Sequence, residues 1–150
     1  MKKIWIVVAS AIQASVYEMS ERDRHLTLVH KLSHEESRMR NQDLVSDRPG
    51  HSAKGRDFAE SISHKLLEAK HFAHDIAEVC EKGRLANAYS SMMVVAEPHF
   101  HGMLNKECST HVQQLIKHHI AKDYTHYSQK KLEDQLKSAW EREIGGLLIS

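Results

Sequence analysis

The sequence is poor in residues that break a chain or cross-link it. Its 150 residues include two prolines, six glycines and two cysteines. Because proline and glycine are the strongest local breakers of helices and strands, their scarcity argues against long irregular linkers. Two cysteines cannot form a disulfide framework, which predicts a reducing compartment and a cytoplasmic protein. At this length, one domain over residues 1–150 buries a hydrophobic core without such cross-links.

An excess of charge of one sign is also missing. Lysine and arginine together number 21 against 20 aspartates and glutamates, and 41% of the residues are apolar. This balance does not indicate a globally basic nucleic-acid binder, although it leaves room for a local basic patch. The composition is that of a globular domain and excludes disorder of the whole chain.

No apolar run approaches the roughly 18 residues that a membrane-spanning helix needs. The N-terminal apolar run, Ile4–Ala9, follows two lysines and leads into a small-residue stretch at residues 9–11, a pattern similar to a short signal peptide. The run falls short of the usual ~7–15 apolar residues of a signal core, and it is rich in β-branched residues. We therefore predict an interior strand here, with a cleaved signal peptide as the alternative.

Two more strands, Ala14–Met19 and His25–Leu32, are predicted on either side of a charged turn at residues 20–24. Three strands so close together predict an antiparallel meander. A helix is predicted over Asp57–Lys82, where Gly83 is the stop signal. A strand at Met92–Ala96, a helix over Phe100–Lys117 and a strand at His118–Tyr124 follow. The last predicted element is a helix from Ser128 to Glu143, which a Glu133–Lys137 pair supports.

The order is strand-strand-strand-helix-strand-helix-strand-helix. A helix between successive strands predicts right-handed crossovers and parallel pairing for the last two strands. The predicted fold class is therefore α/β: a single domain with a mixed five-stranded sheet flanked by helices, and a loose C-terminal tail over residues 143–150.

Apolar residues three or four positions apart define the expected core face of the long helix. They are Phe58, Ile62, Leu66, Ala69, Ala73, Ile76 and Val79. Cys80 falls in the same apolar pattern and is predicted to be a small buried hydrophobe.

The polar segment Ser33–Arg56 is predicted to be a long loop with a short helical turn near Glu35–Arg40. Loops of about twenty residues inside a compact domain are usually functional or disordered. The candidate binding residues in this segment are Arg38, Arg40, Asp47, Arg48, Gly50, Lys54 and Arg56. Cations on such a loop neutralise phosphates without reading sequence, which makes RNA or the ribosome a candidate partner. The alternative is a solvated loop with weak internal ion pairs, and no aromatic residue interleaves with the cations to stack bases.

A second candidate site lies where the last two predicted strands end. Its residues are Glu97, His99, Asp123 and Thr125. The carboxyl edge of parallel strands often binds ligands in α/β proteins, so the two carboxylates raise the hypothesis of a metal-dependent hydrolase. The first strand offers no carboxylate to complete such a site, and the alternative is that both acids are turn and cap residues.

No complete catalytic motif is present. The thirteen histidines include no His-Glu-x-x-His pattern, and neither Cys-x-x-Cys nor a Gly-rich phosphate loop occurs. A serine elbow of the Gly-x-Ser-x-Gly type is missing as well. We predict no catalytic residue, no metal site and no cofactor. The sequence therefore favours a protein that is not an enzyme.

Several stretches together resemble the bacterial host attachment family. They are Ser33–Arg38, Leu44–Gly50 with its Ser-Asp-Arg-Pro-Gly sequence, Val94–Leu104, Lys122–His126 and the first strand with its tryptophan, Trp5. The resemblance spans nearly the whole chain. It implies a role in attachment to host cells, and similarity to the middle domain of archaeal and eukaryotic peptide-chain release factors, which has a ribonuclease H-like arrangement.

The resemblance also has a limit. Release factors carry a Gly-Gly-Gln loop before the long helix, whereas residues 50–56 here contain neither Gly-Gly nor Gln. Peptidyl-tRNA hydrolysis of that type is therefore not supported. Our first hypothesis is a non-enzymatic binding module that contacts RNA or the ribosome, and the alternative is an adhesion-related factor with a protein partner. Exposed edge strands and the apolar tail at residues 147–149 are compatible with a homodimer.

Overall fold

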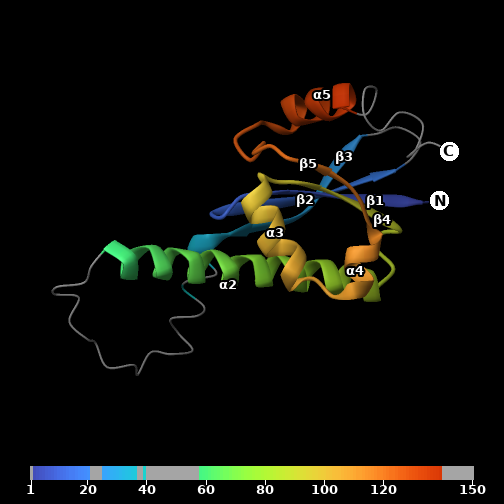
Figure 1. The fold of residues 1–150 in the computed structure, drawn as a ribbon. Helices are drawn as coiled ribbons and strands as arrows, with labels where there is room; N and C mark the ends of the chain where they lie inside the picture. The colour runs from blue at the N-terminus through green and yellow to red at the C-terminus, as the bar shows by residue number, and fades with distance from the viewer. Residues whose placement is uncertain (1, 21–24, 37–38, 40–57, 140–150) are drawn as a thin grey trace.

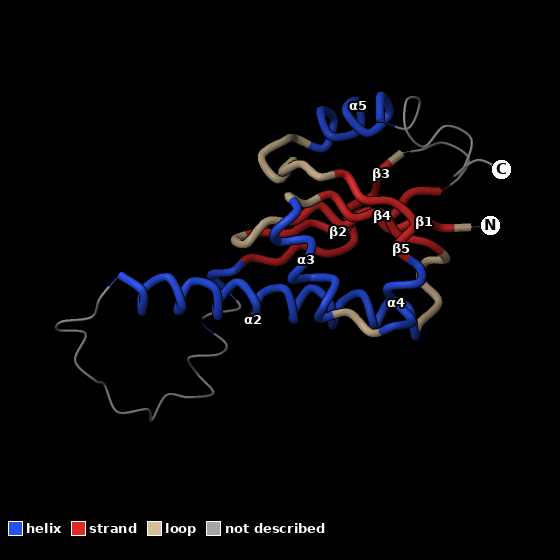
Figure 2. The backbone as a smooth tube through the Cα atoms, viewed as in Figure 1, coloured by secondary structure: helices blue, strands red, loops and turns tan. Residues whose placement is uncertain are grey.

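Five strands form one mixed sheet in the computed structural model, which describes residues 2–20, 25–36, 39 and 58–139, with the side chains of residues 58–62 left out. The strands are β1 (Lys3–Ala9), β2 (Gln13–Ser20), β3 (Leu26–Ser33), β4 (Ser91–Val95) and β5 (Ile116–Ile120). They lie in the order β3-β2-β1-β4-β5 (Figure 2). The first three strands pair antiparallel, whereas β4 pairs parallel with β1 and with β5. The predicted α/β class and mixed sheet are confirmed.

The helices cover the two faces of the sheet unequally. They are α2 (Phe58–Leu85), α3 (Pro98–Glu107), α4 (Thr110–Leu115) and α5 (Gln129–Ala139). In Figure 1, α2, α3 and α4 lie on one face of the sheet and α5 lies on the other. The first turns of α2 extend past the ends of the strands, so they have no sheet beneath them.

The central strand β1 is buried on both faces, as its continuous apolar sequence predicts. Its residues alternate between two hydrophobic clusters: Trp5, Val7 and Ala9 face α2, while Ile4, Ile6 and Val8 face α5. The prediction of an interior strand at the N-terminus is therefore confirmed.

Gly83 does not end the long helix, contrary to the prediction. The helix continues to Leu85, and Asn87 takes the left-handed conformation, with φ at 57°, that commonly follows a helix C-terminus. Gly83 is needed because Trp5 packs directly on it. A Cβ atom at this position would lie 2.7 Å from Cζ3 of the Trp5 ring and closer still to Cη2. The glycine therefore marks a close approach between helix and sheet.

The predicted helix over Phe100–Lys117 is two helices. The chain turns extended at Cys108, and the Ser109 hydroxyl accepts a hydrogen bond from the Val112 amide at 3.2 Å, so that a new helix begins. The side-chain amide of Gln113 donates to a carbonyl at the end of the first helix, that of Asn105, at 2.6 Å. Both helix ends are thus satisfied at the break.

The last strand begins two residues earlier than predicted and ends four residues earlier. β5 pairs with β4 from Ile116, opposite Met92, to Ile120, opposite Val95. The strand ends with its neighbour, because β4 has no residues left to pair beyond that point. The prediction of His118–Tyr124 was wrong since strand length is set by the partner strand.

The final helix is tied to the opposite edge of the sheet. Ser128 caps it by accepting from the Lys131 amide at 3.2 Å, as predicted. The Glu133 carboxylate accepts from the Leu26 amide at 3.0 Å, and Gln129 donates to the Leu26 carbonyl at 2.7 Å. Glu133 therefore bonds to β3, and the structure does not show the predicted pair of Glu133 with Lys137 within the helix.

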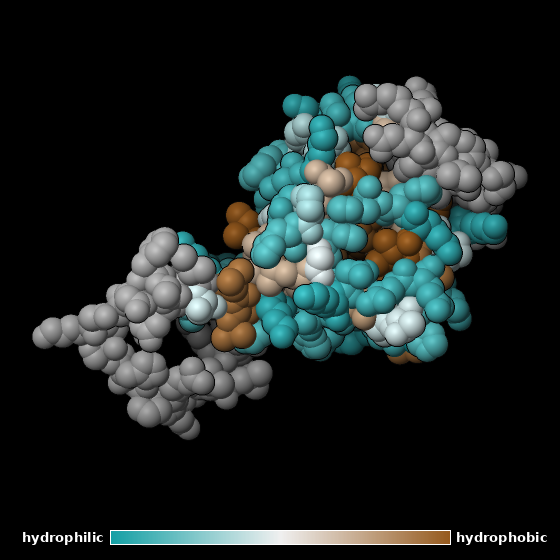
Figure 3. Space-filling view, in the orientation of Figure 1, coloured by the Kyte–Doolittle hydropathy of each residue, from teal (hydrophilic) through white to brown (hydrophobic). Residues whose placement is uncertain are grey.

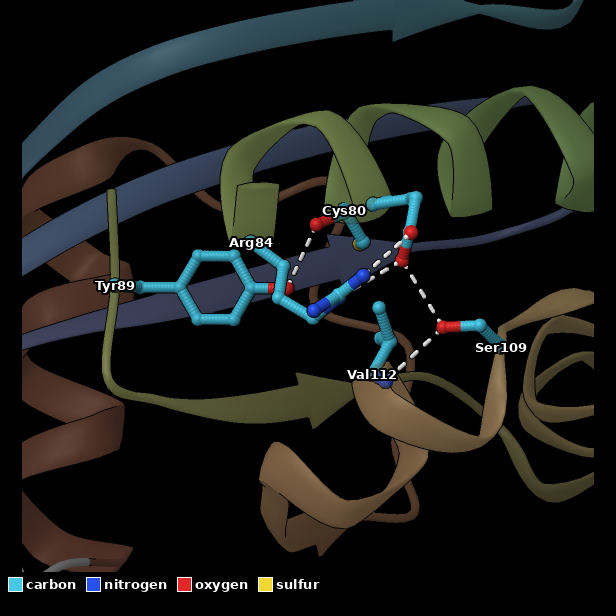
Figure 4. Close-up of polar contacts among 6 residues, drawn as sticks. Cys80, Arg84, Tyr89, Ser109 and Val112 are labelled. Atoms are coloured by element: carbon cyan, nitrogen blue, oxygen red, sulfur yellow. Dashed lines mark hydrogen bonds and ion pairs between the residues drawn. The ribbon is translucent and has the colours of Figure 1, made fainter. Parts of the chain in front are cut away.

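A polar network fixes α4 against the end of α2 (Figure 4). Arg84 donates two hydrogen bonds to Glu81, at 2.7 and 3.0 Å, and the Ser109 hydroxyl donates to the same carboxylate at 3.0 Å. These contacts, that of Arg84 foremost, lower the pKa of Glu81 to about 2. Beside them, the Tyr89 hydroxyl donates to the Cys80 carbonyl at 2.7 Å. Cys80 is buried, which confirms that this cysteine is a core residue, and burial raises the pKa of its thiol.

Candidate functional site

The acid that follows β4 is engaged in starting a helix. Both carboxylate oxygens of Glu97 accept backbone hydrogen bonds, from His99 at 3.0 Å and from Phe100 at 2.6 Å. Glu97 is therefore the N-cap of α3, with Pro98 in the first helical position. Its charge lies at the positive end of the helix dipole, where it stabilises the helix.

The acid that follows β5 is engaged in a turn. The Oδ1 atom of Asp123 accepts from the Thr125 amide at 2.9 Å and from the Thr125 hydroxyl at 2.5 Å. Asp123 is exposed, and its bonds serve its own segment rather than Glu97. The alternative reading of both acids, as cap and turn residues, agrees with this geometry. In the described ranges, no three histidines, cysteines or acids are grouped to hold a metal ion.

Two histidines that the sequence did not single out as a pair meet near the same edge. The rings of His101, on α3, and His119, on β5, stack with centroids 3.6 Å apart and planes at 12°. His119 donates through Nε2 to the Ala96 carbonyl at 2.8 Å, whereas the buried Nε2 of His101 has no partner among the described residues. Burial first, and then the neighbouring His119, lowers the pKa of His101. The stack therefore favours a neutral His101 ring.

The predicted loop candidates lie outside the described residues. This applies to Arg38, Arg40, Asp47, Arg48, Gly50, Lys54 and Arg56. Of the second set, Glu97 and His99 line one hollow in the surface at the start of α3, whereas Asp123 and Thr125 are bonded to each other and do not line it.

This hollow is part of a groove between α2 and α3, which we call the α2–α3 groove. One part, of about 450 Å³, is lined by Ser63, Leu66, Leu67, Lys70, His99, Met103, Lys106 and Glu107. A second part, of about 260 Å³, is lined by Ala11, Lys65, Leu66, Ala69, Glu97, His99, Phe100 and Met103. The two parts share Leu66, His99 and Met103, so they form one continuous depression. Figure 3 shows hydrophobic surface gathered over this part of α2.

The groove was missed because Leu66 was predicted to be a core residue. Its spacing does place it on the apolar face of the helix, with Ala73 and Ile76, both of which are buried. Leu66 is nevertheless 47% exposed and Leu67 is 50% exposed. Two adjacent leucines cannot both face the same core in a helix, since neighbours are about 100° apart. The Leu66-Leu67 pair was the signal in the sequence that an apolar surface lies there.

The comparisons with known proteins are informative at the family level. A family model described as "Protein required for attachment to host cells" matches residues 5–136. Among solved structures, a chain described as "Archaeal protein" matches with a TM-score of 0.47 and 10% sequence identity. That match covers 97% of this chain and 40% of the archaeal chain, so this chain spans less than half of that protein. No curated protein matches.

Proposed function

Because the chain belongs to the family of proteins required for attachment to host cells, we propose that it is a non-enzymatic binding module. It serves attachment by holding a protein partner rather than by carrying out a reaction. The single observation that carries this proposal is the contrast between two places on the fold. The carboxylates at the sheet edge are engaged in a cap and a turn, whereas the α2–α3 groove presents open apolar surface.

Exposed apolar surface of this kind is typical of interaction sites. The groove's leucines are half exposed, and a folded chain loses free energy by leaving large side chains in water without a partner. Glu97, by contrast, has both oxygens occupied by backbone donors. A general acid or base needs an oxygen aimed at a substrate, so the cap geometry favours binding over catalysis.

The test replaces Asp123, the edge acid that does not line the groove, conservatively in cells that otherwise lack the protein. Asp123→Asn keeps an acceptor oxygen for the turn but removes the charge. We expect attachment to host cells to stay at the wild-type level. Removing a general acid or base costs roughly 10²–10⁴-fold in rate, so attachment that fell to the level of cells without the protein, with thermal unfolding unchanged, would overturn the proposal.

RNA or the ribosome is the second candidate partner, and the cations of residues 38–56 favour it. The related predictions of a release-factor-like and ribonuclease H-like domain belong with it and stay predictions. Phosphate contacts release counterions, so binding to RNA should weaken steeply between low and moderate salt. Replacing Arg38, Arg48 and Arg56 with alanine should weaken it further, and salt-independent binding would remove this candidate.

The location of the protein and its assembly also remain proposals. Across the described residues, no helix has both the length and the apolar character to cross a membrane. A cytoplasmic location and a homodimer stay predictions, to be checked by cell fractionation and by light scattering.

A further inference from the structure

The α2–α3 groove has the dimensions of a helix-binding site. On the α2 bank the lining residues fall at positions 63, 66, 67 and 70, and on the α3 bank at positions 99, 103, 106 and 107. Each bank therefore offers one row of side chains spaced i, i+3 or i+4, and i+7. Seven residues of helix rise about 10 Å, so each row is two turns long. A docked helix presents anchors with that same spacing.

The walls of the groove are apolar and adaptable. Leu66 and Leu67 are half exposed, and Met103, half buried, packs its side chain against the core beneath. Methionine suits a binding surface because its unbranched side chain adjusts to different partners. The smaller part of the groove reaches Ala11, and the next residue, Ile12, is 60% exposed. Apolar surface thus continues from the groove to the turn between β1 and β2.

The backbone in the groove is already satisfied, which excludes one mode of recognition. Both banks are helices, so their amide and carbonyl groups are bonded within each helix. An extended peptide adds to an exposed sheet edge through backbone hydrogen bonds. No described residue of the edge strands β3 and β5 lines this groove. Recognition here depends on side chains, as it does when a helix docks.

The charged residues that line the groove are three lysines and two glutamates, a small excess of positive charge. Lys65 and Lys70 on α2 and Lys106 on α3 are exposed, and among the described side chains none of them forms an ion pair. The acids nearby are occupied, since Glu107 contacts His74 at 3.1 Å and Glu97 caps α3. A partner with acidic residues therefore gains attraction from both banks.

We propose that the α2–α3 groove binds an amphipathic helix of a partner protein, with an apolar stripe on Leu66, Leu67 and Met103 and acidic residues beside the lysines. This inference rests on the proposed function and names the surface and the partner class. The apolar stripe supplies affinity, and the acidic flanks set specificity against basic helices.

The experiment uses a defined probe and the full chain. The probe is a fluorescent 15-residue helical peptide with leucines at positions i, i+4 and i+7 and glutamates on both flanks. A matched peptide carries lysines in place of the glutamates. Fluorescence anisotropy measures both affinities, and we expect the glutamate peptide to bind at least about tenfold more tightly.

Two groove variants and two matched controls locate the site. Leu67→Asp should weaken binding of the glutamate peptide by about tenfold or more, whereas Leu85→Asp, at an exposed leucine outside the groove on the same helix, should leave it unchanged. The combined change Lys70→Glu and Lys106→Glu should reverse the preference between the peptides. Lys130→Glu on α5, across the sheet, should not (Figure 1).

Several outcomes would overturn the inference: equal affinity for the two peptides, equal effects of Leu67→Asp and Leu85→Asp, or no binding up to about millimolar peptide. A dimer of the chain that Leu67→Asp dissociates, without peptide binding, would assign the groove to a second copy and also overturn it. The inference and the proposed function fail separately. Loss of attachment in the Asp123→Asn variant, with peptide binding intact, removes the proposed function and leaves the groove as a helix-binding site.

Discussion

At the scale of single residues, the contact between Trp5 and Gly83 shows how one position constrains another far away in the sequence. The Trp5 ring stacks on Tyr89, with centroids 4.6 Å apart, and lies against His30 at 5.4 Å. This places a large ring where the α2 backbone passes, and only a residue without a side chain fits. The glycine is thus a packing residue inside a helix, although glycine usually weakens helices.

Gly83→Ala should destabilise the protein even though alanine is the better helix former. The helix gains up to about 1 kcal/mol, but overpacking against the Trp5 ring costs roughly 1–3 kcal/mol. Chemical denaturation should give a net loss of about 1–2 kcal/mol. Gly102→Ala is the matched control, because a Cβ atom there meets no atom within 4 Å, and it should stabilise α3. Equal effects of the two changes would contradict the packing account.

The His101–His119 stack predicts a loss of stability in acid. The pKa of His101 is lowered in the folded state, so the unfolded chain binds more protons than the folded one as the pH falls below the ordinary histidine value. The contribution is fully present above about pH 6.5 and is lost as the pH falls through that value toward the lower folded-state pKa. Comparing His101→Leu with the wild type by denaturation should show the variant gaining relative stability from pH 7.5 to 5.5.

His126→Leu provides the control for this pH profile. His126 is exposed and lies outside the stack, so this variant shows how the measurement responds to the removal of a histidine that is not stacked. A flat profile for His101→Leu, parallel to that of the control, would show that the stacked ring is protonated as easily as a free one.

At the scale of elements, boundaries are decided by contacts between elements. Ser109 divides one apolar helical pattern into α3 and α4 because its hydroxyl is held from both sides, by Val112 and by Glu81. A serine and a threonine at residues 109–110 are a cap signal in the sequence, yet the periodicity runs on through them. The contact with the Glu81 carboxylate on α2 holds the Ser109 hydroxyl where it caps α4.

Ser109→Ala should therefore cost about 1–2 kcal/mol of stability, since it removes the cap and a hydrogen bond to a carboxylate. Thr110→Ala, at the next and exposed position, should stay within about 0.5 kcal/mol of the wild type. The Glu81 pKa, which NMR titration can follow, should rise from about 2 toward its ordinary value. A lowered carboxyl pKa stabilises the folded state at pH values above the ordinary pKa of the group, and this stabilisation is lost as the pH falls toward 2. The variant has less of this stabilisation, so it should lose less stability than the wild type in acid.

At the scale of the whole molecule, the sheet divides the protein into two unlike halves. One face carries α2, α3 and α4 (Figure 1), and its hydrophobic cluster includes Trp5 and Phe72. The other face carries α5, whose Leu132 belongs to one cluster with Ile6. The first turns of α2 extend beyond the strands, and the half-exposed Leu66 and Leu67 lie in the N-terminal half of the same helix. The candidate binding surface thus lies on the half of α2 that reaches past the sheet.

Much of this fold could be predicted from the sequence, because local patterns determine most of its strands and helices. The strands β1 to β4 and the long helix α2 follow from local patterns: a continuous apolar run for a strand buried on both faces, and spacing of three or four for a helix with one buried face. The order of strands and helices then limits the sheet to few arrangements, because a helix between parallel strands crosses over with one hand.

Apart from the break between α3 and α4, the sequence by itself determined the kinds and order of the elements, because backbone hydrogen bonding and side-chain period are local properties. Only the tertiary structure decided what each side chain meets. It placed Gly83 under a tryptophan. It also stacked two histidines on different elements and left Leu66 in water at a position with core spacing. These outcomes depend on distances between segments far apart in the chain, which periodicity does not contain.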